Sequence, residues 1–179
     1  GHGDTGAAIV NHPDVDKIAF TGSTNVGKII QRAVAGTRKK TTLELGGKSA
    51  NIIFDDAPID QAVEGIVNGI FFNQGHVCCA GSRLFVQENI AEQVIRKLKD
   101  RMESLYVGDP LDKNTDIGAI NSKEQLETIQ KYIKIGKAEG AEIHQSSCAI
   151  PSKGYFCRPT LFTGVSQSHV IAQIGRAHV

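Results

Sequence analysis

The chain has 179 residues, enough for one ordinary domain or for one large domain with part of a second. Apolar residues make up 40% and the formal net charge is +1, so intrinsic disorder and an electrostatic footprint for nucleic acid or an acidic membrane are both disfavoured. Tryptophan is absent and aromatic residues are only 6%, which also disfavours a base-stacking surface. We therefore expect a globular protein that binds no nucleic acid.

The four cysteines predict reduced thiols. No spacing among Cys78, Cys79, Cys148 and Cys157 matches a C-x-x-C zinc pair, and adjacent Cys78 and Cys79 are poorly placed to bridge each other, so we expect no metal site. No apolar stretch approaches the roughly 18 residues of a membrane span, and the chain starts without Met. We expect a cytoplasmic protein with no membrane contact whose N-terminus is missing, and a mitochondrial targeting peptide in that missing part stays open.

The first half of the chain alternates between strand and helix patterns. Residues 18–20 form a short apolar run, a glycine turn follows at 21–24, and apolar residues then recur at helical spacing until Gly36. Two short segments suit strands, residues 41–45 and 50–54.

A core-facing helix is predicted next, opened by acidic residues and Pro58 and carrying a continuous apolar face to Phe71. Gly65 and Gly69 lie inside it, and we expect each to allow close approach of another element, since glycine costs about 1 kcal/mol relative to alanine in a helix.

The second half continues the alternation. The pattern predicts, in chain order, a strand at 83–87, a helix at 94–105, a polar loop at 108–118, a helix at 126–136, a strand at 141–144 and an extended segment at 154–162. This order favours an α/β architecture with a largely parallel sheet.

A glycine turn before a helix is the first candidate site. Backbone N–H groups at the start of the helix after Gly22 would favour an anionic group such as a pyrophosphate, and Ser23 could add a hydroxyl donor. An ordinary strand–helix turn with Ser23 as the helix cap explains the same residues. The literal G-x-G-x-x-G at the start of the chain is weaker, because no strand precedes it.

Two further segments could carry chemistry. Glu44 ends a short strand before two glycines, where a carboxylate is usually solvated or paired with a residue such as Lys48. Cys78 follows the core helix in a loop of small residues, where a thiol is either a small buried hydrophobe or a nucleophile whose thiolate is favoured by His76 or Arg83.

Together these segments resemble the aldehyde dehydrogenase superfamily over nearly the whole chain. The resemblance is carried, in order, by FTGST at residues 20–24, LELGGKS at 43–49, NQG-x-x-C at 73–78 and GDP at 108–110. The stretch from Val77 onward is also similar to family sixteen of this superfamily.

The resemblance implies a role for each matched residue. Cys78 matches the family's nucleophile, and Glu44 matches the general base that activates water. The turn facing the phosphates of NAD or NADP is matched by Gly22 and Ser23, and backbone near the nicotinamide by Leu45 and Gly46. The implied reaction is the NAD(P)-dependent oxidation of an aldehyde to a carboxylic acid, through a cysteine thiohemiacetal and a thioester.

The resemblance also implies the domain layout. Residues 1–46 resemble the C-terminal part of a Rossmann-type NAD(P)-binding domain, and residues 47–173 resemble most of an α/β catalytic domain. Residues 174–179 match one reading frame of a common sequencing adapter, and we interpret them as an artefactual tail. The chain is therefore expected to be a fragment that is inactive alone and part of a homo-oligomer when full length.

Departures from the family keep rival functions open. His76 stands where the family usually has Gln or Glu, and we favour a structural role for it over a catalytic one. One alternative is a non-catalytic aldehyde-dehydrogenase-like subunit that serves assembly or binding. Another is a bare dinucleotide-binding module of a regulatory protein, which would leave the Cys78 loop unexplained.

Overall fold

The computed structural model describes residues 1–173. The chain divides into two compact units, residues 1–46 and the part from Gly47 onward, and each unit is described by itself.

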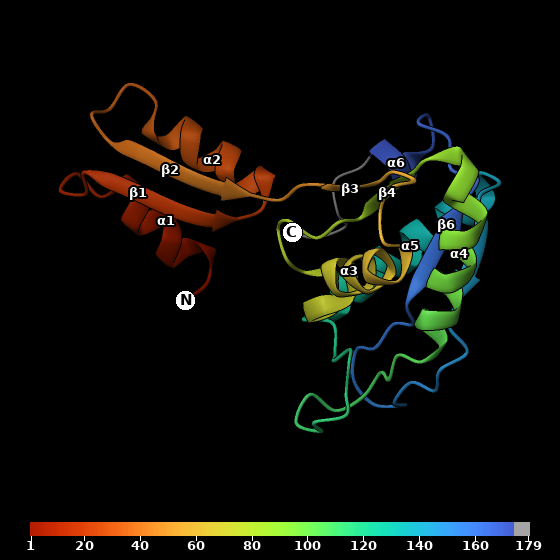
Figure 1. The fold of residues 1–179 in the computed structure, drawn as a ribbon. Helices are drawn as coiled ribbons and strands as arrows, with labels where there is room; N and C mark the ends of the chain where they lie inside the picture. The colour runs from red at the N-terminus through yellow and green to blue at the C-terminus, as the bar shows by residue number, and fades with distance from the viewer. Residues whose placement is uncertain (174–179) are drawn as a thin grey trace. The chain divides into compact units, whose positions relative to one another are not determined.

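The first unit packs two helices with a two-stranded parallel ribbon. Its elements in chain order are α1 (Gly3–Asn11), β1 (Lys17–Gly22), α2 (Thr24–Val34) and β2 (Lys40–Leu45) (Figure 1). β1 and β2 pair from Lys17 with Lys40 to Gly22 with Leu45. One core joins all four elements, built from Val10, Ile18, Ile30 and Val34, with Val15, Phe20 and Leu43 packed against it.

Helix α1 has no counterpart among the expected elements. Gly3 and Gly6 of the G-x-G-x-x-G spacing lie inside this helix, and a Cβ on either would meet nothing within 4 Å. The glycines of this motif therefore lie at the start of a helix and do not form a phosphate-binding turn. Gly27 of α2 has a clear packing reason, because a Cβ there would lie 2.8 Å from the side chain of Leu45 on β2.

The second unit carries the remaining elements. They are β3 (Ala50–Ile53), α3 (Ile59–Phe71), the short 3-10 turn η1 (Phe72–Gly75), β4 (Arg83–Val86), α4 (Glu88–Glu103), α5 (Lys123–Ala138), β5 (Glu142–Gln145), β6 (Thr160–Thr163) and α6 (Val170–Gln173). β3 and β4 pair in parallel, whereas β5 and β6 pair antiparallel.

The strand pairing bears out the α/β architecture but corrects the expectation of one largely parallel sheet. The described residues form three separate two-stranded ladders, and two of these are parallel. Parallel neighbours need a long crossover, which α3 supplies between β3 and β4. No helix separates β5 from β6, so the chain can return directly in the antiparallel direction.

The core of the second unit lies between α3 and α4, which are in contact with each other. Helical spacing places three buried residues of α3 on the side that faces α4, namely Val63, Ile66 and Val67. The other buried residues of this core are Val94, Leu98, Met102, Leu105, Val107 and Ile117. The exposed sides of the two helices are joined by the ion pairs Lys97–Asp60, at 2.7 Å, and Arg101–Glu64, at 2.8 Å.

The two glycines inside α3 differ in their surroundings. A Cβ on Gly65 would meet nothing within 4 Å, so the expected close approach is wrong there. Gly69 does meet a neighbour: its carbonyl accepts a hydrogen bond from the backbone N–H of Gly81 at 3.1 Å. The loop after α3 therefore folds back onto the helix at this point.

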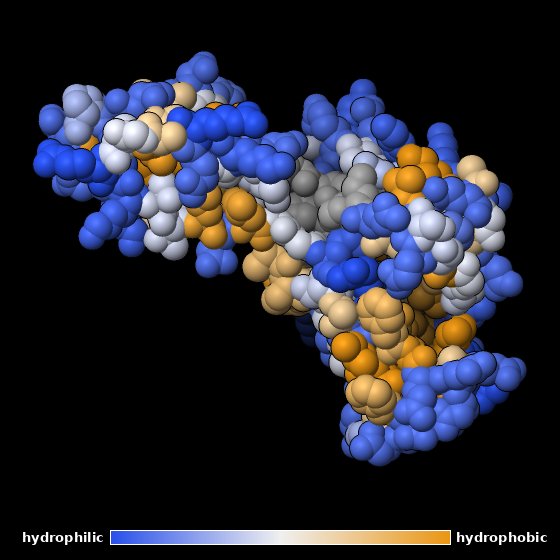
Figure 2. Space-filling model, turned by 90° about the horizontal axis from the view of Figure 1, so that it is seen from above, coloured by the Kyte–Doolittle hydropathy of each residue, from blue (hydrophilic) through white to orange (hydrophobic). Residues whose placement is uncertain are grey.

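The outer face of the β3–β4 ladder is apolar and exposed. Ile52 and Phe85 are directly paired across the ladder and are 61% and 39% exposed, and Phe54 follows on the same face at 62%. Figure 2 shows hydrophobic residues in several areas of the face in view, between hydrophilic ones.

Within residues 1–173, no helix is both long enough and apolar enough to cross a membrane. Within the same residues, no group of three or more histidine, cysteine, aspartate or glutamate side chains is arranged to hold a metal ion.

Candidate functional site

Cys78 lies at the exposed tip of a tight turn in the second unit. The backbone N–H of Ala80 donates to the carbonyl of Val77 at 3.0 Å, which makes Cys78 and Cys79 the two central residues of a β-turn. Both cysteines are exposed and free, whereas Ala80 is buried. Among the described residues, the backbone N–H of Cys78 has no hydrogen-bond partner. The turn therefore presents a thiol and an N–H donor from the same residue.

A left-handed run of three residues leads into this turn. Asn73, Gln74 and Gly75 have φ values of 48°, 55° and 76°. The run ends α3 and reverses the chain, and the backbone N–H of His76 then donates to the carbonyl of Asn73 at 2.9 Å. The His76 ring bonds the same carbonyl through Nδ1, at 3.0 Å. This contact fits the structural role that we favour for His76.

The end of the Cys78 loop is anchored to α3 and β3. Besides the bond from Gly81 to Gly69, the side chain of Asn51 packs directly against Gly81, where a Cβ would lie 2.7 Å from Asn51 Cγ. Asn51 Nδ2 also lies 3.5 Å from the Gly81 carbonyl, at the limit of a hydrogen bond. Any side chain at position 81 would therefore displace the side-chain amide of Asn51.

Arg83 joins the loop to the segment that follows Glu44 in the sequence. Its guanidinium donates twice to the carbonyl of Lys48, from Nε at 3.1 Å and from Nη2 at 2.8 Å. Its backbone N–H donates to the carbonyl of Ser49 at 3.2 Å. Gly47 also lies beside the turn, since a Cβ there would be 3.8 Å from the carbonyl oxygen of Cys78. The end of the LELGGKS segment and the Cys78 turn are thus neighbours within the second unit.

The remaining predicted residues lie in the first unit. Glu44 is exposed near the end of β2, directly paired with Thr21, and Leu45 is paired with Gly22. Leu45 packs against Gly27 of α2, so its side chain has a structural role. Lys48, which we considered as a partner for Glu44, donates from Nζ to the carbonyl of Ile171 at 2.6 Å.

Gly22 and Ser23 have clear local roles. A Cβ on Gly22 would collide with the ring of Phe20, so glycine makes room for a core side chain. Ser23 is buried and its Oγ accepts from the backbone N–H of Val26 at 3.1 Å. Ser23 is therefore the N-cap of α2, one of the two interpretations that the sequence left open. A hydroxyl that accepts in a cap keeps its proton available for a second partner.

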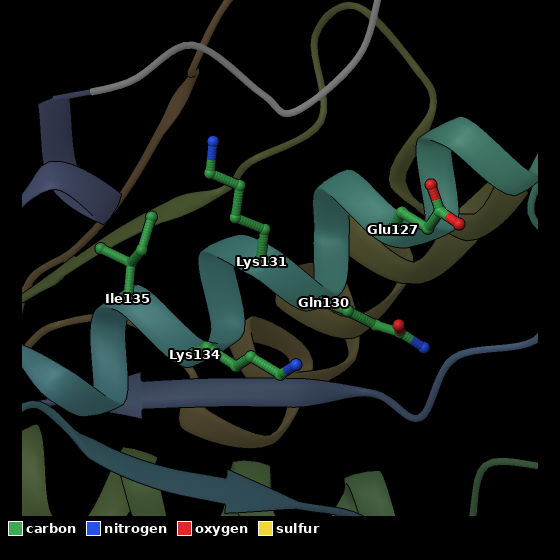
Figure 3. Close-up of a pocket in the computed structure, with 5 residues that line it drawn as sticks. All are labelled: Glu127, Gln130, Lys131, Lys134 and Ile135. Carbon is green, nitrogen blue, oxygen red and sulfur yellow. The ribbon is translucent and has the colours of Figure 1, made fainter.

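A shallow surface pocket in the described part of the chain contains none of these residues. It has a volume of about 370 Å³ and is lined by Glu127, Gln130, Lys131, Lys134 and Ile135 (Figure 3). All five belong to α5, and in Figure 3 Lys131 points away from the side on which Lys134 and Gln130 lie. Side chains from one exposed helix do not enclose a ligand, so we assign this pocket no function.

Comparison with known proteins decides the family. The model of the aldehyde dehydrogenase family matches residues 1–174. The chain belongs to this family. Human retinal dehydrogenase 2 is 48% identical over 175 residues, which cover 97% of this chain and 34% of that protein. Aldehyde dehydrogenase family 2 member C4 of Arabidopsis thaliana is 49% identical over 97% of this chain and 35% of its own length.

Solved aldehyde dehydrogenases share the fold. The NAD+ complex of the Bacillus cereus enzyme has a TM-score of 0.94 and 44% identity, covering 99% of this chain and 36% of that structure. The NAD-dependent enzyme of Sinorhizobium meliloti has a TM-score of 0.95 and 38% identity over similar shares. These likenesses confirm the superfamily and the α/β aldehyde dehydrogenase fold. The narrower likeness to family sixteen stays a prediction.

The chain spans about a third of the length of the relatives it matches. The sequence assigns no role to Asn51 and gives Gln74 only a place in the NQG-x-x-C motif, whereas the structure joins Asn51 to Gly81 and Gln74 to Ala119. These contacts cannot be predicted from the sequence, because the partners of Asn51 and Gln74 lie 30 and 45 positions away. The suspected tail at 174–179 lies outside the described residues.

Proposed function

We propose that the full-length protein carrying this chain oxidises an aldehyde to a carboxylic acid with NAD or NADP, using Cys78 as nucleophile and Glu44 as general base. Membership of the aldehyde dehydrogenase family supports this function. The observation that carries it is the exposed thiol of Cys78 at the tip of a turn anchored on both sides. In this proposal residues 1–46 belong to the cofactor domain, residues 47–173 belong to the catalytic domain, and the chain is inactive alone.

The chemistry assigned to Cys78 needs both of the groups that its turn presents. The thiolate sulfur attacks the carbonyl carbon of the aldehyde, and the carbonyl oxygen becomes an oxyanion. The backbone N–H of Cys78 is a donor for that oxyanion, an interaction worth about 3 kcal/mol in comparable sites. The former aldehyde hydrogen then leaves the thiohemiacetal with its electron pair, which produces a thioester on Cys78.

Glu44 is assigned to the second half of the reaction. Its carboxylate takes a proton from water, and the resulting hydroxide attacks the thioester carbon. The carboxylic acid leaves and the Cys78 thiolate is restored. Glu44 is the second-last residue of β2 and is exposed, so the fold leaves its carboxylate accessible to water.

The start of α2 fits a phosphate of the cofactor. Thr24 and Asn25 occupy the first helical positions, where backbone N–H groups lack partners within the helix and favour an anion. Ser23 adds a hydroxyl, and Leu45 and Gly46 supply backbone for the nicotinamide end. When bound, NAD(P)+ accepts the hydride that leaves the thiohemiacetal.

Replacing Cys78 by serine in the full-length protein tests the assignment. We expect the turnover of aldehyde with NAD or NADP to fall by about 10³-fold or more, because the alkoxide needed for attack is scarce at neutral pH. The matched control is Cys79→Ser, which removes a neighbouring exposed thiol and leaves turnover within a few-fold. The measurement is the absorbance of the reduced cofactor with a panel of aldehydes.

The same experiment separates the rival functions. A wild-type protein that oxidises no aldehyde and binds no cofactor supports the non-catalytic subunit. Saturable NAD binding without turnover supports the bare dinucleotide-binding module. Turnover that survives Cys78→Ser overturns the nucleophile assignment.

Homo-oligomerisation and a cytoplasmic location complete the proposal. The four cysteines are all free, as expected for a reducing compartment. Light scattering of the purified full-length protein and fractionation of the cells that make it test these two points.

A further inference from the structure

Gln74 is held in a backbone conformation that its residue type disfavours. Of the three left-handed residues before the Cys78 turn, Asn73 and Gly75 are types that adopt positive φ readily, but glutamine is not. Strain of this kind persists only where the surroundings hold it, and it gathers at functional sites. Something other than local preference must therefore keep Gln74 at φ 55°.

The side chain of Gln74 supplies that restraint. Its Nε2 donates to the carbonyl of Ala119 at 3.0 Å, across 45 positions of sequence. The amide also lies close to Gly118, the residue before Ala119, because a Cβ on Gly118 would be 3.0 Å from Gln74 Nε2. A larger residue at 118 would push the amide away from its acceptor.

The acceptor stands on a rigid part of the unit. Ile117 is buried, forms a bridge with Val107 and accepts from the backbone N–H of Gly108 at 3.0 Å. On the other side of Ala119, the backbone N–H of the buried Ile120 donates to the carbonyl of Tyr155 at 2.6 Å. Gln74 thus connects the strained run to a segment that is fixed on both sides of the contact.

We propose that Gln74 is a positioning residue, whose amide locks the left-handed run onto the 117–120 segment and so sets the orientation of the turn that presents Cys78. Only three residues separate Gln74 from Cys78, and the His76 contacts to Asn73 depend on the same left-handed run. The effect of Gln74 on catalysis rests on the proposed function. Its role in holding the left-handed run does not depend on that function.

The test uses the full-length protein with Gln74→Met and Gln74→Gly. Methionine has a similar length but no N–H donor, and glycine adopts positive φ without strain but has no side chain. The matched control is Gln145→Met, since Gln145 Nε2 also donates one hydrogen bond, to Thr160 Oγ1 at 3.0 Å. The measurements are kcat and KM for an aldehyde, amide hydrogen exchange, and the midpoint of thermal unfolding.

We expect Gln74→Met to lower kcat by about 10- to 100-fold with little change in KM, as for a misplaced reacting group. Exchange of the His76 and Gly81 amides should rise in this variant, while exchange in α4 stays at the wild-type level. Gln74→Gly should unfold at a temperature no lower than Gln74→Met but have the same low kcat. Gln145→Met should match the wild type in kcat and in the exchange of His76 and Gly81.

Three outcomes would overturn the inference. They are an unchanged kcat and exchange pattern in Gln74→Met, full activity in Gln74→Gly, or a loss of activity that only follows a general loss of stability. If the wild-type protein oxidises no aldehyde, the proposed function fails, and the exchange of His76 and Gly81 still decides whether Gln74 holds the turn.

Discussion

Glu103 ties the end of α4 to the segment that follows β5. One carboxylate oxygen accepts from the backbone N–H of Ser147 at 2.8 Å and from its hydroxyl at 2.7 Å, and the other lies 3.1 Å from Nε2 of His144. The backbone N–H of Ser147 is the main cause that holds the pKa of Glu103 below its ordinary value of 4.5.

The lowered pKa of Glu103 predicts a pH-dependent contribution to stability. A carboxyl group whose pKa is lower in the folded state stabilises the fold above its unfolded pKa, and this stabilisation is lost as the pH falls through the folded pKa. Glu103→Gln should therefore lower the urea midpoint of the full-length protein at pH 7, with a difference that shrinks below about pH 4.

Glu127→Gln is the control for Glu103, since within residues 1–173 the carboxylate of Glu127 makes only an exposed pair with Lys123, at 3.7 Å. Its urea midpoint should stay close to that of the wild type at both pH values. A difference between Glu103→Gln and the wild type that is as large in acid as at pH 7 would contradict the assignment.

At the scale of whole elements, α2 and α5 begin in the same way. Ser23 Oγ accepts from the backbone N–H of Val26 and Ser122 Oγ from that of Gln125, both at 3.1 Å. The two caps make the same bond to the helix, although the Ser122 side chain also bonds the carboxylate of Glu124. Only the first lies in the turn that we assign to the cofactor phosphates.

Alanine at each cap separates the two roles of Ser23. Ser23→Ala and Ser122→Ala should each cost about 1 kcal/mol of stability, the usual value of an N-cap. Only Ser23→Ala should also raise the KM for NAD(P), because it removes a hydroxyl donor from the phosphate site. Denaturant titration and steady-state kinetics of the full-length variants measure these effects, and equal KM values in both variants would leave Ser23 as a cap alone.

Over the whole molecule, the exposed outer face of β3–β4 is the feature with the largest expected consequence. Ile52 and Phe85 are paired across the ladder and Phe54 extends the same face, so these side chains form one contiguous apolar area. An uncovered area of this kind binds hydrophobic dyes and promotes self-association.

We expect the 179-residue chain, expressed alone, to bind the dye ANS and to form aggregates. The double change Ile52→Thr and Phe85→Thr should reduce both effects. Leu111→Ser is the control, because Leu111 is 92% exposed and outside this face. Equal ANS fluorescence and equal light scattering of the double variant and the parent chain would contradict this expectation.

Local patterns were sufficient for most of the regular elements. The helix predicted from Pro58 to Phe71 is α3 (Ile59–Phe71), and the strand predicted at 83–87 is β4 (Arg83–Val86). The extended segment predicted at 154–162 forms a strand only from Thr160, since Gly154 has a φ of 101° and the residues before Thr160 belong to a loop. Helix α1 was missed because its glycines and alanines carry little apolar periodicity.

The sequence by itself determined the family motifs, the residues to which we assign chemistry, and most helix and strand positions, because these depend on neighbours within a few residues. Only the tertiary structure decided how the Cys78 turn is held. The bonds from Gln74 to Ala119 and from Arg83 to Lys48 join residues 45 and 35 positions apart. The packing of whole elements decides which distant carbonyl a side chain can reach. A local pattern of residues therefore cannot predict these bonds.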